Sequence, residues 1–177
     1  MKKIVQKEDK ILREHTKEIP VGEITTPKIK KVLKEMSEAL KSQSDGVAIA
    51  APQIGYLLST FVVSGKIFHK DFVRGEKEFK KIPEEEIQKN LIFINPKISK
   101  LSKEKEWLPE GCLSVRWLYG KNRRSKKATV TAYDENGKKF QRGASGLLAQ
   151  IFQHETDHLR GVLFIDNAKD VKEELPK

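Results

Sequence analysis

The segment Gln153-His154-Glu155-Thr156-Asp157-His158 holds the residues whose types and spacing are best suited to chemistry. It follows the pattern H-E-x-x-H, and in a helix His154 and His158 lie one turn apart on the same face. Two imidazoles at this spacing can hold one metal ion, with Glu155 beside them to move protons. Because the pattern also occurs by chance on solvated helices, the segment alone leaves a metal site and an ordinary helix as alternatives.

The flanking residues predict that this segment is helical. Residues at helical period run through it, at Leu148, Ile151, Phe152, Glu155 and Leu159. Ser145 suits the N-cap of such a helix, and Gly161 suits its C-terminal stop. We therefore expect a buried helix that carries both histidines and Glu155 on or near its inward face.

A third metal ligand is available in Cys112, the only cysteine of the chain. A thiolate is a strong ligand for Fe(II) or Zn(II), although a lone cysteine often serves as a small buried apolar residue. Gly111 before it would let the backbone approach a ligand closely. Together Cys112, His154 and His158 would leave a fourth coordination position for water, which is typical of catalytic metal sites.

Three segments resemble the signature motifs of the peptide deformylase family, in the order that the family has them. They are Gly46-Val47-Ala48-Ile49-Ala50-Ala51-Pro52-Gln53, Glu110-Gly111-Cys112-Leu113-Ser114 and Gln153-His154-Glu155-Thr156-Asp157-His158-Leu159-Arg160-Gly161. The resemblance extends over nearly the whole chain, from Ile4 to Asp166. It implies an α+β fold in which antiparallel or mixed strands surround a central metal-binding helix.

The resemblance also implies a function, which is removal of the N-formyl group from the formylmethionine of newly made polypeptides. A metal ion lowers the pKa of a bound water to about 7, and the resulting hydroxide would attack the formyl carbon. Glu155 would act as general base and then acid. The side-chain amide of Gln53 and the backbone N–H of Leu113 would stabilise the oxyanion.

By the same resemblance, the backbone of Gly46, Val47, Ala48 and Gly111 would pair with an extended peptide substrate. One divalent ion per chain is implied, with Fe(II) as the native metal and Zn(II) or Ni(II) as replacements after purification. Two features depart from the family pattern. Ala48 replaces a glycine, and Arg116 to Arg124 is bulky and basic where the family has a proline and then a basic residue. We interpret the latter mainly as a solvated loop, with an altered substrate rim as the alternative.

Composition narrows the class of protein further. The 177 residues suit one catalytic domain, with a charged insertion at 66–90 and a short polar tail at 167–177. A single cysteine excludes an internal disulfide, and no secretory signal or apolar membrane span is present, so we expect a cytoplasmic protein. The net charge of +10 would favour a transient ribosome contact. Because acids are interspersed among the lysines, we interpret the charge mainly as solubility and expect no specific nucleic acid and no membrane as partner.

Several other elements are predicted by local pattern. Thr26 and Pro27 suit the start of a helix whose apolar positions are Ile29, Val32, Leu33, Met36 and Leu40. Strands are expected at 57–63 and 91–98, and a hairpin at 128–142 that turns at Asn136-Gly137. His15 and His69 are expected to have no metal role, with His69 in a solvated loop.

Two other classes of function remain as alternatives. A metallopeptidase would take its third ligand downstream of His158, where only Asp166, Asp170, Glu173 and Glu174 are available. Such an enzyme would leave Cys112 and Gln53 without a role. A deformylase-like scaffold that binds RNA through its basic surface would not need the complete set of Cys112, His154, Glu155 and His158.

Overall fold

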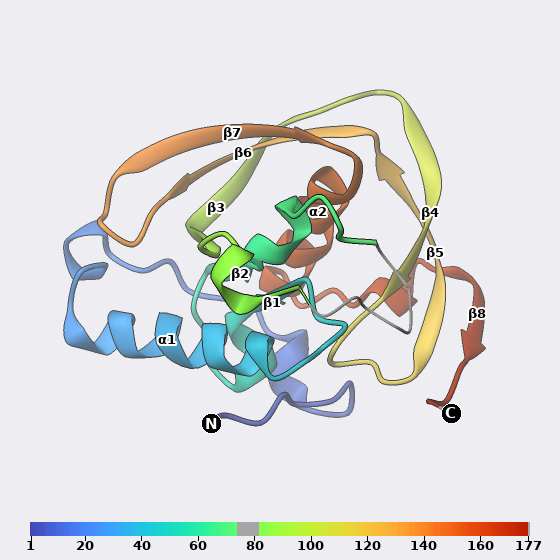
Figure 1. Ribbon diagram of the computed structural model, residues 1–177, viewed down its shortest axis with the longest axis horizontal. Helices are drawn as coiled ribbons and strands as arrows, with labels where there is room; N and C mark the ends of the chain where they lie inside the picture. Colours follow the sequence, from blue (N-terminus) through green and yellow to red (C-terminus); the bar gives the residue numbers. More distant parts are fainter. Residues whose placement is uncertain (74–81, 177) are drawn as a thin grey trace.

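The computed structural model describes residues 1–73 and 82–176, and its elements form an α+β fold (Figure 1). The helices are α1 (Pro27–Lys41) and α2 (Gly146–Leu159). The strands are β1 (Ala48–Ala50), β2 (Thr60–Val63), β3 (Leu91–Leu101), β4 (Lys105–Gly111), β5 (Leu118–Ser125), β6 (Lys127–Tyr133), β7 (Lys139–Ser145) and β8 (Lys169–Glu173). Short 3₁₀ turns occur at Lys10–Arg13, Val21–Glu23, Ala51–Ile54, Gly65–Phe68, Glu84–Glu86 and Phe164–Asp166. The predicted fold class is confirmed.

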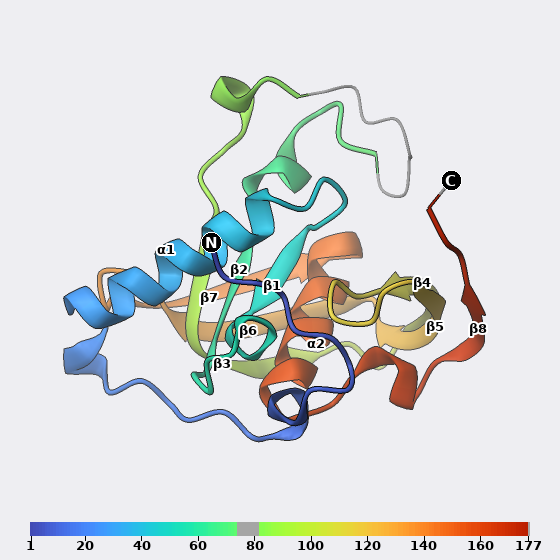
Figure 2. The ribbon, with the colours of Figure 1, turned by 90° about the horizontal axis from the view of Figure 1, so that it is seen from below.

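The strands form two antiparallel sheets that meet around α2 (Figure 2). The larger sheet has the order β1-β2-β3-β6-β7, and the smaller has the order β4-β5-β8. Helix α2 contacts strands of both sheets, including β1, β6 and β5. Since β1 and β4 each have one neighbour in their sheet, both are edge strands, and both lead into motifs that the sequence had singled out.

The apolar core lies on both sides of the larger sheet. One cluster packs the inward face of α1 against β1 and β2, and it includes Met36, Leu40 and Ile49. The other packs α2 against the opposite face through Phe152, with Phe61 and Phe93 stacked at 4.7 Å between ring centroids. Both helices therefore bury the faces that their apolar period predicts.

Both helices begin where their sequences predict, and α2 also ends at its predicted stop. Helix α1 begins after Thr26 with Pro27 in its first turn. Helix α2 begins after Ser145, and Gly161 follows its end with a φ of +74°, which favours glycine. A Cβ at Gly161 would lie 2.5 Å from the carbonyl oxygen of Arg13, so this stop also allows the N-terminal segment to pack closely.

The predicted β elements need several corrections. The hairpin of β6 and β7 is confirmed, with Gly137 at a φ of +78° in the turn. The first predicted strand begins only at Thr60, and the second extends to Leu101. The solvated loop expected at 116–124 is wrong, because Leu118–Ser125 is strand β5, paired on both sides with β4 and β8. The segment 167–177, expected as a polar tail, contains strand β8.

The charged insertion expected at 66–90 stays a prediction, and its residues 74–81 lie outside the described residues. His69 in this region is not solvated: its side chain is 10% exposed and its Nε2 lies 3.1 Å from Glu86 Oε2. His15 is exposed. Within residues 1–73 and 82–176, neither histidine joins a cluster of metal-ligating side chains. The same residues contain no helix long and apolar enough to cross a membrane.

Candidate metal centre

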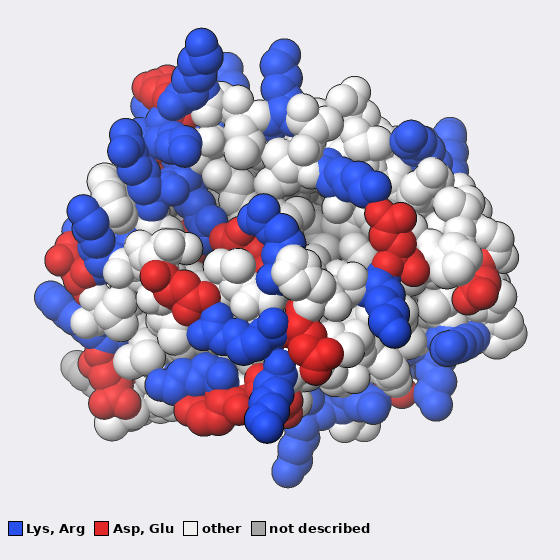
Figure 3. Space-filling model, turned by 180° about the vertical axis from the view of Figure 1, so that it is seen from behind, with Lys and Arg blue, Asp and Glu red and all other residues white. Residues whose placement is uncertain are grey.

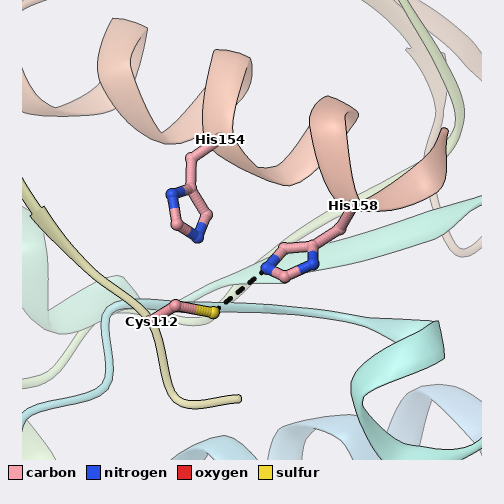
Figure 4. Close-up of side chains that lie close together, drawn as sticks. All are labelled: Cys112, His154 and His158. Carbon is pink, nitrogen blue, oxygen red and sulfur yellow. Dashed lines mark hydrogen bonds between the residues drawn. The ribbon is translucent and has the colours of Figure 1, made fainter. Parts of the chain in front are cut away.

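Helix α2 presents His154 and His158 from successive turns toward one point (Figure 4). Their ring centroids are 5.0 Å apart and the ring planes are inclined by 71°. His158 is buried at 1% exposure, whereas His154 is half-buried. The one-turn spacing read from the sequence thus places two imidazoles side by side at the edge of the core.

Cys112 reaches the same point from the turn that follows β4. Its Sγ lies 3.3 Å from His158 Nε2 (Figure 4). One ligand atom from each of Cys112, His154 and His158 lies within 4.8 Å of the other two. The third ligand therefore comes from upstream in the chain, and the acidic residues downstream of His158 join no such cluster in the described part of the molecule.

Three observations show that these residues fit a divalent metal ion. A thiol and two imidazoles are the ligand set of sites that bind Fe(II) or Zn(II). Burial disfavours charge on His154, yet hydrogen bonds with Cys112 and Glu110 raise the pKa of this imidazole well above its usual value. The surroundings thus favour a positive charge at this position, which a metal ion also supplies. Nearby, Glu155 Oε2 is buried and has no hydrogen-bond partner among the described residues.

Glu110 anchors the metal centre from the inner face of the small sheet. Its Oε2 lies 3.0 Å from His154 Nδ1. Arg124 on β5 donates from Nε and Nη2 to its two oxygens at 2.6 and 2.9 Å, and Asn122 donates to Oε2 at 3.3 Å. Arg124 also donates from Nη1 to Asp157 on α2 at 2.7 Å. This network fixes His154 Nδ1 to Glu110, which leaves Nε2 for a metal.

The network also sets the charges around the centre. Burial would raise the pKa of Glu110, but hydrogen bonds with Arg124 and His154 hold this pKa far below its usual value. Burial, followed by the charge of His154, lowers the pKa of His158 well below its usual value, which keeps this imidazole neutral and able to bind a metal. Burial raises the pKa of Glu155 to about 7.

We expect Glu110→Gln to weaken metal binding about 10–100-fold, since this is the usual cost of losing the partner that orients a ligating histidine. The amide keeps the size of the carboxylate but removes the charge that faces His154 Nδ1. Competition with a chromophoric chelator measures the affinity directly, without an activity assay. Glu104→Gln is the control, because Glu104 is exposed and pairs with Lys126. Equal affinity in the two variants would contradict the anchoring role of Glu110.

Gln53 lies beside the three ligands, in the 3₁₀ turn that follows β1. It is 1% exposed. Its Oε1 accepts the N–H of Ala50 at 2.8 Å, so its amide nitrogen points the other way. That nitrogen donates to Ser114 Oγ at 3.1 Å and lies 3.5 Å from Cys112 Sγ. The side chain is therefore held rigidly with its donor group directed at the centre.

Leu113 directly follows the cysteine in a tight turn. The carbonyl of Cys112 accepts the N–H of Val115 at 3.0 Å. In a trans peptide the N–H points opposite to the preceding carbonyl, so the Leu113 N–H is directed out of this turn. The Leu113 side chain contacts Gly46, where a Cβ would lie 3.2 Å from Leu113 Cδ1. The first and second motifs thus touch at the site.

The other predicted substrate residues lie on edge strands or directly before one. Val47 precedes β1 and its carbonyl accepts the N–H of Ser64 on the β2 side at 2.8 Å. Ala48 begins β1 and is outside the positive-φ region, so alanine fits this position without strain. Gly111 ends β4, and a Cβ there would lie 2.7 Å from the Tyr119 ring. Close packing of Tyr119 therefore explains this glycine.

The basic segment after the second motif contributes an ion pair across the same region. Arg116 Nη2 donates to Asp45 Oδ1 and to Gln43 Oε1, both at 2.9 Å, and Nη1 also binds Asp45. Its guanidinium also lies 4.7 Å from the Trp117 ring centroid. Arg116 therefore links the turn after Cys112 to the chain before Gly46. This arginine stands in the segment where the family pattern has a proline.

Sequence reasoning assigned no role to Glu110, Arg124 or Asp157, although the first and last stand inside the quoted motifs. The available signal was their type: acids within a motif that enters the core need a partner of opposite charge. Arg124 gave no such signal, because it stood in a segment interpreted as a loop.

A helix that carries H-E-x-x-H beside a cysteine thiol, enclosed by two antiparallel sheets, is an arrangement that suits a metal-dependent hydrolase. The family model described as polypeptide deformylase matches residues 1–174. The chain belongs to this family, whose members are metal-dependent enzymes. It is 38% identical to peptide deformylase 2 of Clostridium acetobutylicum over 166 residues. This aligned region covers 94% of each of the two chains.

Solved structures of peptide deformylases agree with this assignment. The probable peptide deformylase of Synechococcus phage S-SSM7 has a TM-score of 0.75 and 32% identity, covering 94% of this chain and 99% of that one. The peptide deformylase of Synechococcus elongatus, solved in complex with actinonin, has a TM-score of 0.75 and 29% identity. Its match covers 96% of this chain and 79% of that one.

Proposed function

We propose that this enzyme removes the formyl group from the N-terminal formylmethionine of newly made polypeptides and releases formate. The observation that carries the proposal is the convergence of Cys112, His154 and His158 within 4.8 Å beside the buried amide of Gln53. A divalent metal bound by these residues, natively Fe(II) and replaceable by Zn(II) or Ni(II), supplies the Lewis acid that activates a water near neutral pH.

Glu155 moves the proton in this reaction. It takes the proton of the attacking water and returns it to the amine that leaves. A proton carrier works best when its pKa lies near the working pH, and burial raises the pKa of Glu155 to about 7. Because its Oε2 has no hydrogen-bond partner among the described residues, this oxygen can accept a proton from the attacking water.

Gln53 and Leu113 stabilise the negative oxygen that develops on the formyl group. A donor is most effective when it is already oriented before the reaction, and both groups are held by other bonds. The N–H of Ala50 fixes the Gln53 amide, and the turn from Cys112 to Val115 fixes the Leu113 N–H. The two donors come from the first and second motifs, which are in contact at Gly46.

We expect Gln53→Ala to lower turnover about 10²–10³-fold, the usual cost of one oxyanion donor. Metal content should stay at the parental level, since Gln53 is not one of the three ligands. The measurement is the rate of formate release from a formyl-Met peptide, with metal determined on the same sample. Gln141→Ala on the exposed strand β7 is the matched control. A metal-replete Gln53→Ala enzyme with parental turnover would exclude this donor role.

The substrate peptide binds as an added strand between the two sheet edges. The Val47 carbonyl is turned toward β2, so the backbone groups of Ala48 face the opposite, free side of β1. Gly111 ends the other edge strand, β4, one residue before Cys112. A peptide held by Ala48 and Gly111, beside Gly46 and Val47, would direct its formyl end to the three ligands.

Formate release from a formyl-Met tripeptide by the metal-loaded enzyme tests this function. The acetyl-Met tripeptide is the matched control substrate, because it differs by one methyl group at the reacting carbon. Hydrolysis of the acetyl peptide would release acetate, so the free N-terminal amine is measured for both substrates, and we expect it to appear from the formyl peptide alone. If the metal-loaded protein released no formate from any formyl peptide, the scaffold interpretation would be favoured. Metal analysis after anaerobic purification identifies the native ion.

A further inference from the structure

The outer face of the sheet β4-β5-β8 gathers positive charge around an exposed tryptophan. Residues directly opposite each other on antiparallel strands share a face, and the pairs here are Trp107 with Arg123 and Lys121 with Lys169. The intervening Glu110, Asn122 and Arg124 face inward, where they hold the metal centre. The side chains that carry the argument are Lys105, Trp107, Lys121, Arg123, Lys169 and Lys172, here called the basic face.

The charge of the basic face is not balanced locally. Inside the sheet, Arg124 is bound by two carboxylates. Outside it, Lys121 lies 3.9 Å from Asp170, and no other cation of the basic face is within 4 Å of a carboxylate in the described part of the chain. Some lysines elsewhere on the surface do have acidic partners, as Lys97 has in Glu18 and Lys126 in Glu104. Figure 3 shows blue side chains gathered at the upper left, with red side chains among them and along the left edge below.

Trp107 gives the basic face a second property. The side chain is 44% exposed, and Lys169 Nζ lies 4.6 Å from its ring centroid. An exposed aromatic ring among cations suits a single-stranded nucleic acid, because an unpaired base stacks on the ring while the cations neutralise phosphates. A duplex keeps its bases stacked on one another and offers only its phosphates to such a surface.

We propose that the basic face binds single-stranded RNA without sequence preference, through its five cations and through stacking of a base on Trp107. The two faces of the β4-β5-β8 sheet then have separate functions. The inner face anchors His154 through Glu110 and Arg124, and the outer face holds RNA. Because Gly111 ends β4 directly before Cys112, bound RNA would keep the catalytic centre close to an RNA-rich particle while the chemistry itself remains unchanged.

The test is binding of a fluorescein-labelled oligouridylate of twelve nucleotides, followed by anisotropy at low salt. We expect Lys121→Glu/Arg123→Glu to weaken binding at least tenfold and to reduce the slope of log affinity against log salt by about 1.4, or about 0.7 for each lost phosphate contact. The matched control is Lys28→Glu/Lys31→Glu on α1, which changes net charge equally at exposed positions. It should weaken binding less than about threefold.

Stacking of a base on Trp107 is tested by a separate variant and a separate RNA probe. Trp107→Ala should weaken binding of the oligouridylate about tenfold and leave the salt slope unchanged, since no charge is removed. The parent should bind the single strand more tightly than an RNA duplex of equal length. Formate release at the parental rate shows that each variant is folded, and Lys105→Ala/Lys172→Ala replaces the double glutamate variant if that one does not fold.

The proposal is overturned by any of three results. These are absence of binding by the parent at low salt, equal loss of affinity in the α1 control and the basic-face variant, and equal affinity of the parent for duplex and single strand. None of these results bears on formate release, so the proposed deformylase function would stand.

Discussion

Cys112→Ala is expected to yield a folded protein that retains no metal and releases no formate. Sγ is one of three ligand atoms that lie within 4.8 Å of one another, and two imidazoles alone leave the ion largely to solvent. The loss of affinity should exceed the 10–100-fold expected for Glu110→Gln, because a ligand is removed rather than its partner. Alanine removes a single sulfur atom from a half-buried side chain, so the fold is expected to survive.

His158→Ala is expected to behave in the same way, and His69→Ala provides its matched control. His69 is also largely shielded and hydrogen-bonded to a carboxylate, but it lies outside the cluster. Elemental analysis of anaerobically purified protein gives the metal content per chain, and circular dichroism shows that each variant is folded. One metal per chain in folded Cys112→Ala, with parental formate release, would refute the proposed ligand set.

The helices and the hairpin were predictable because their signals are local. The start of α1 at Pro27, the stop of α2 before Gly161 and the turn at Asn136-Gly137 each depend on neighbours a few residues away. Helical period then fixed which face of α1 is buried, whereas α2 is buried on nearly all sides, polar positions such as Gln153 and Thr156 included. These features need no knowledge of the rest of the chain.

Strand β5 could not be predicted in this way. Alternation is present, with Lys121 and Arg123 exposed and Gly120 and Asn122 buried, but its buried positions are a glycine, an amide and the hydroxyl of Ser125. A hydrophobic pattern is therefore absent, and the strand forms because distant residues complete it. Asn122 binds Glu110 and the carbonyl of Phe164, and β4 and β8 pair on its two sides.

The metal centre was likewise predictable only in the part that depends on local sequence. Spacing predicted that His154 and His158 share a helix face. The approach of Cys112, 46 residues before His158, rested on family resemblance, because no local rule relates two such distant segments. The network that orients His154 was missed since Arg124 belongs to β5. The free sheet edge at Ala48 could not be predicted either, because it depends on the sheet order, in which β1 has one neighbour.

Glu155→Gln is expected to lower turnover about 10²–10⁴-fold while metal content stays at the parental level. The amide has nearly the same size as the carboxylate, so the side chain keeps its place at 4% exposure, but it cannot accept a proton from water. Stability should not fall, because the amide cannot carry the negative charge that burial disfavours on Glu155.

Separation of turnover from metal content makes this variant informative about the mechanism. A ligand variant loses both properties together, whereas a proton carrier should lose turnover alone. The measurement is kcat for a formyl-Met tripeptide on samples of equal metal content, with Glu104→Gln as the control at an exposed glutamate. Parental kcat in metal-replete Glu155→Gln would assign the proton transfer to another group. Loss of metal together with kcat would instead show that Glu155 acts by holding the site together.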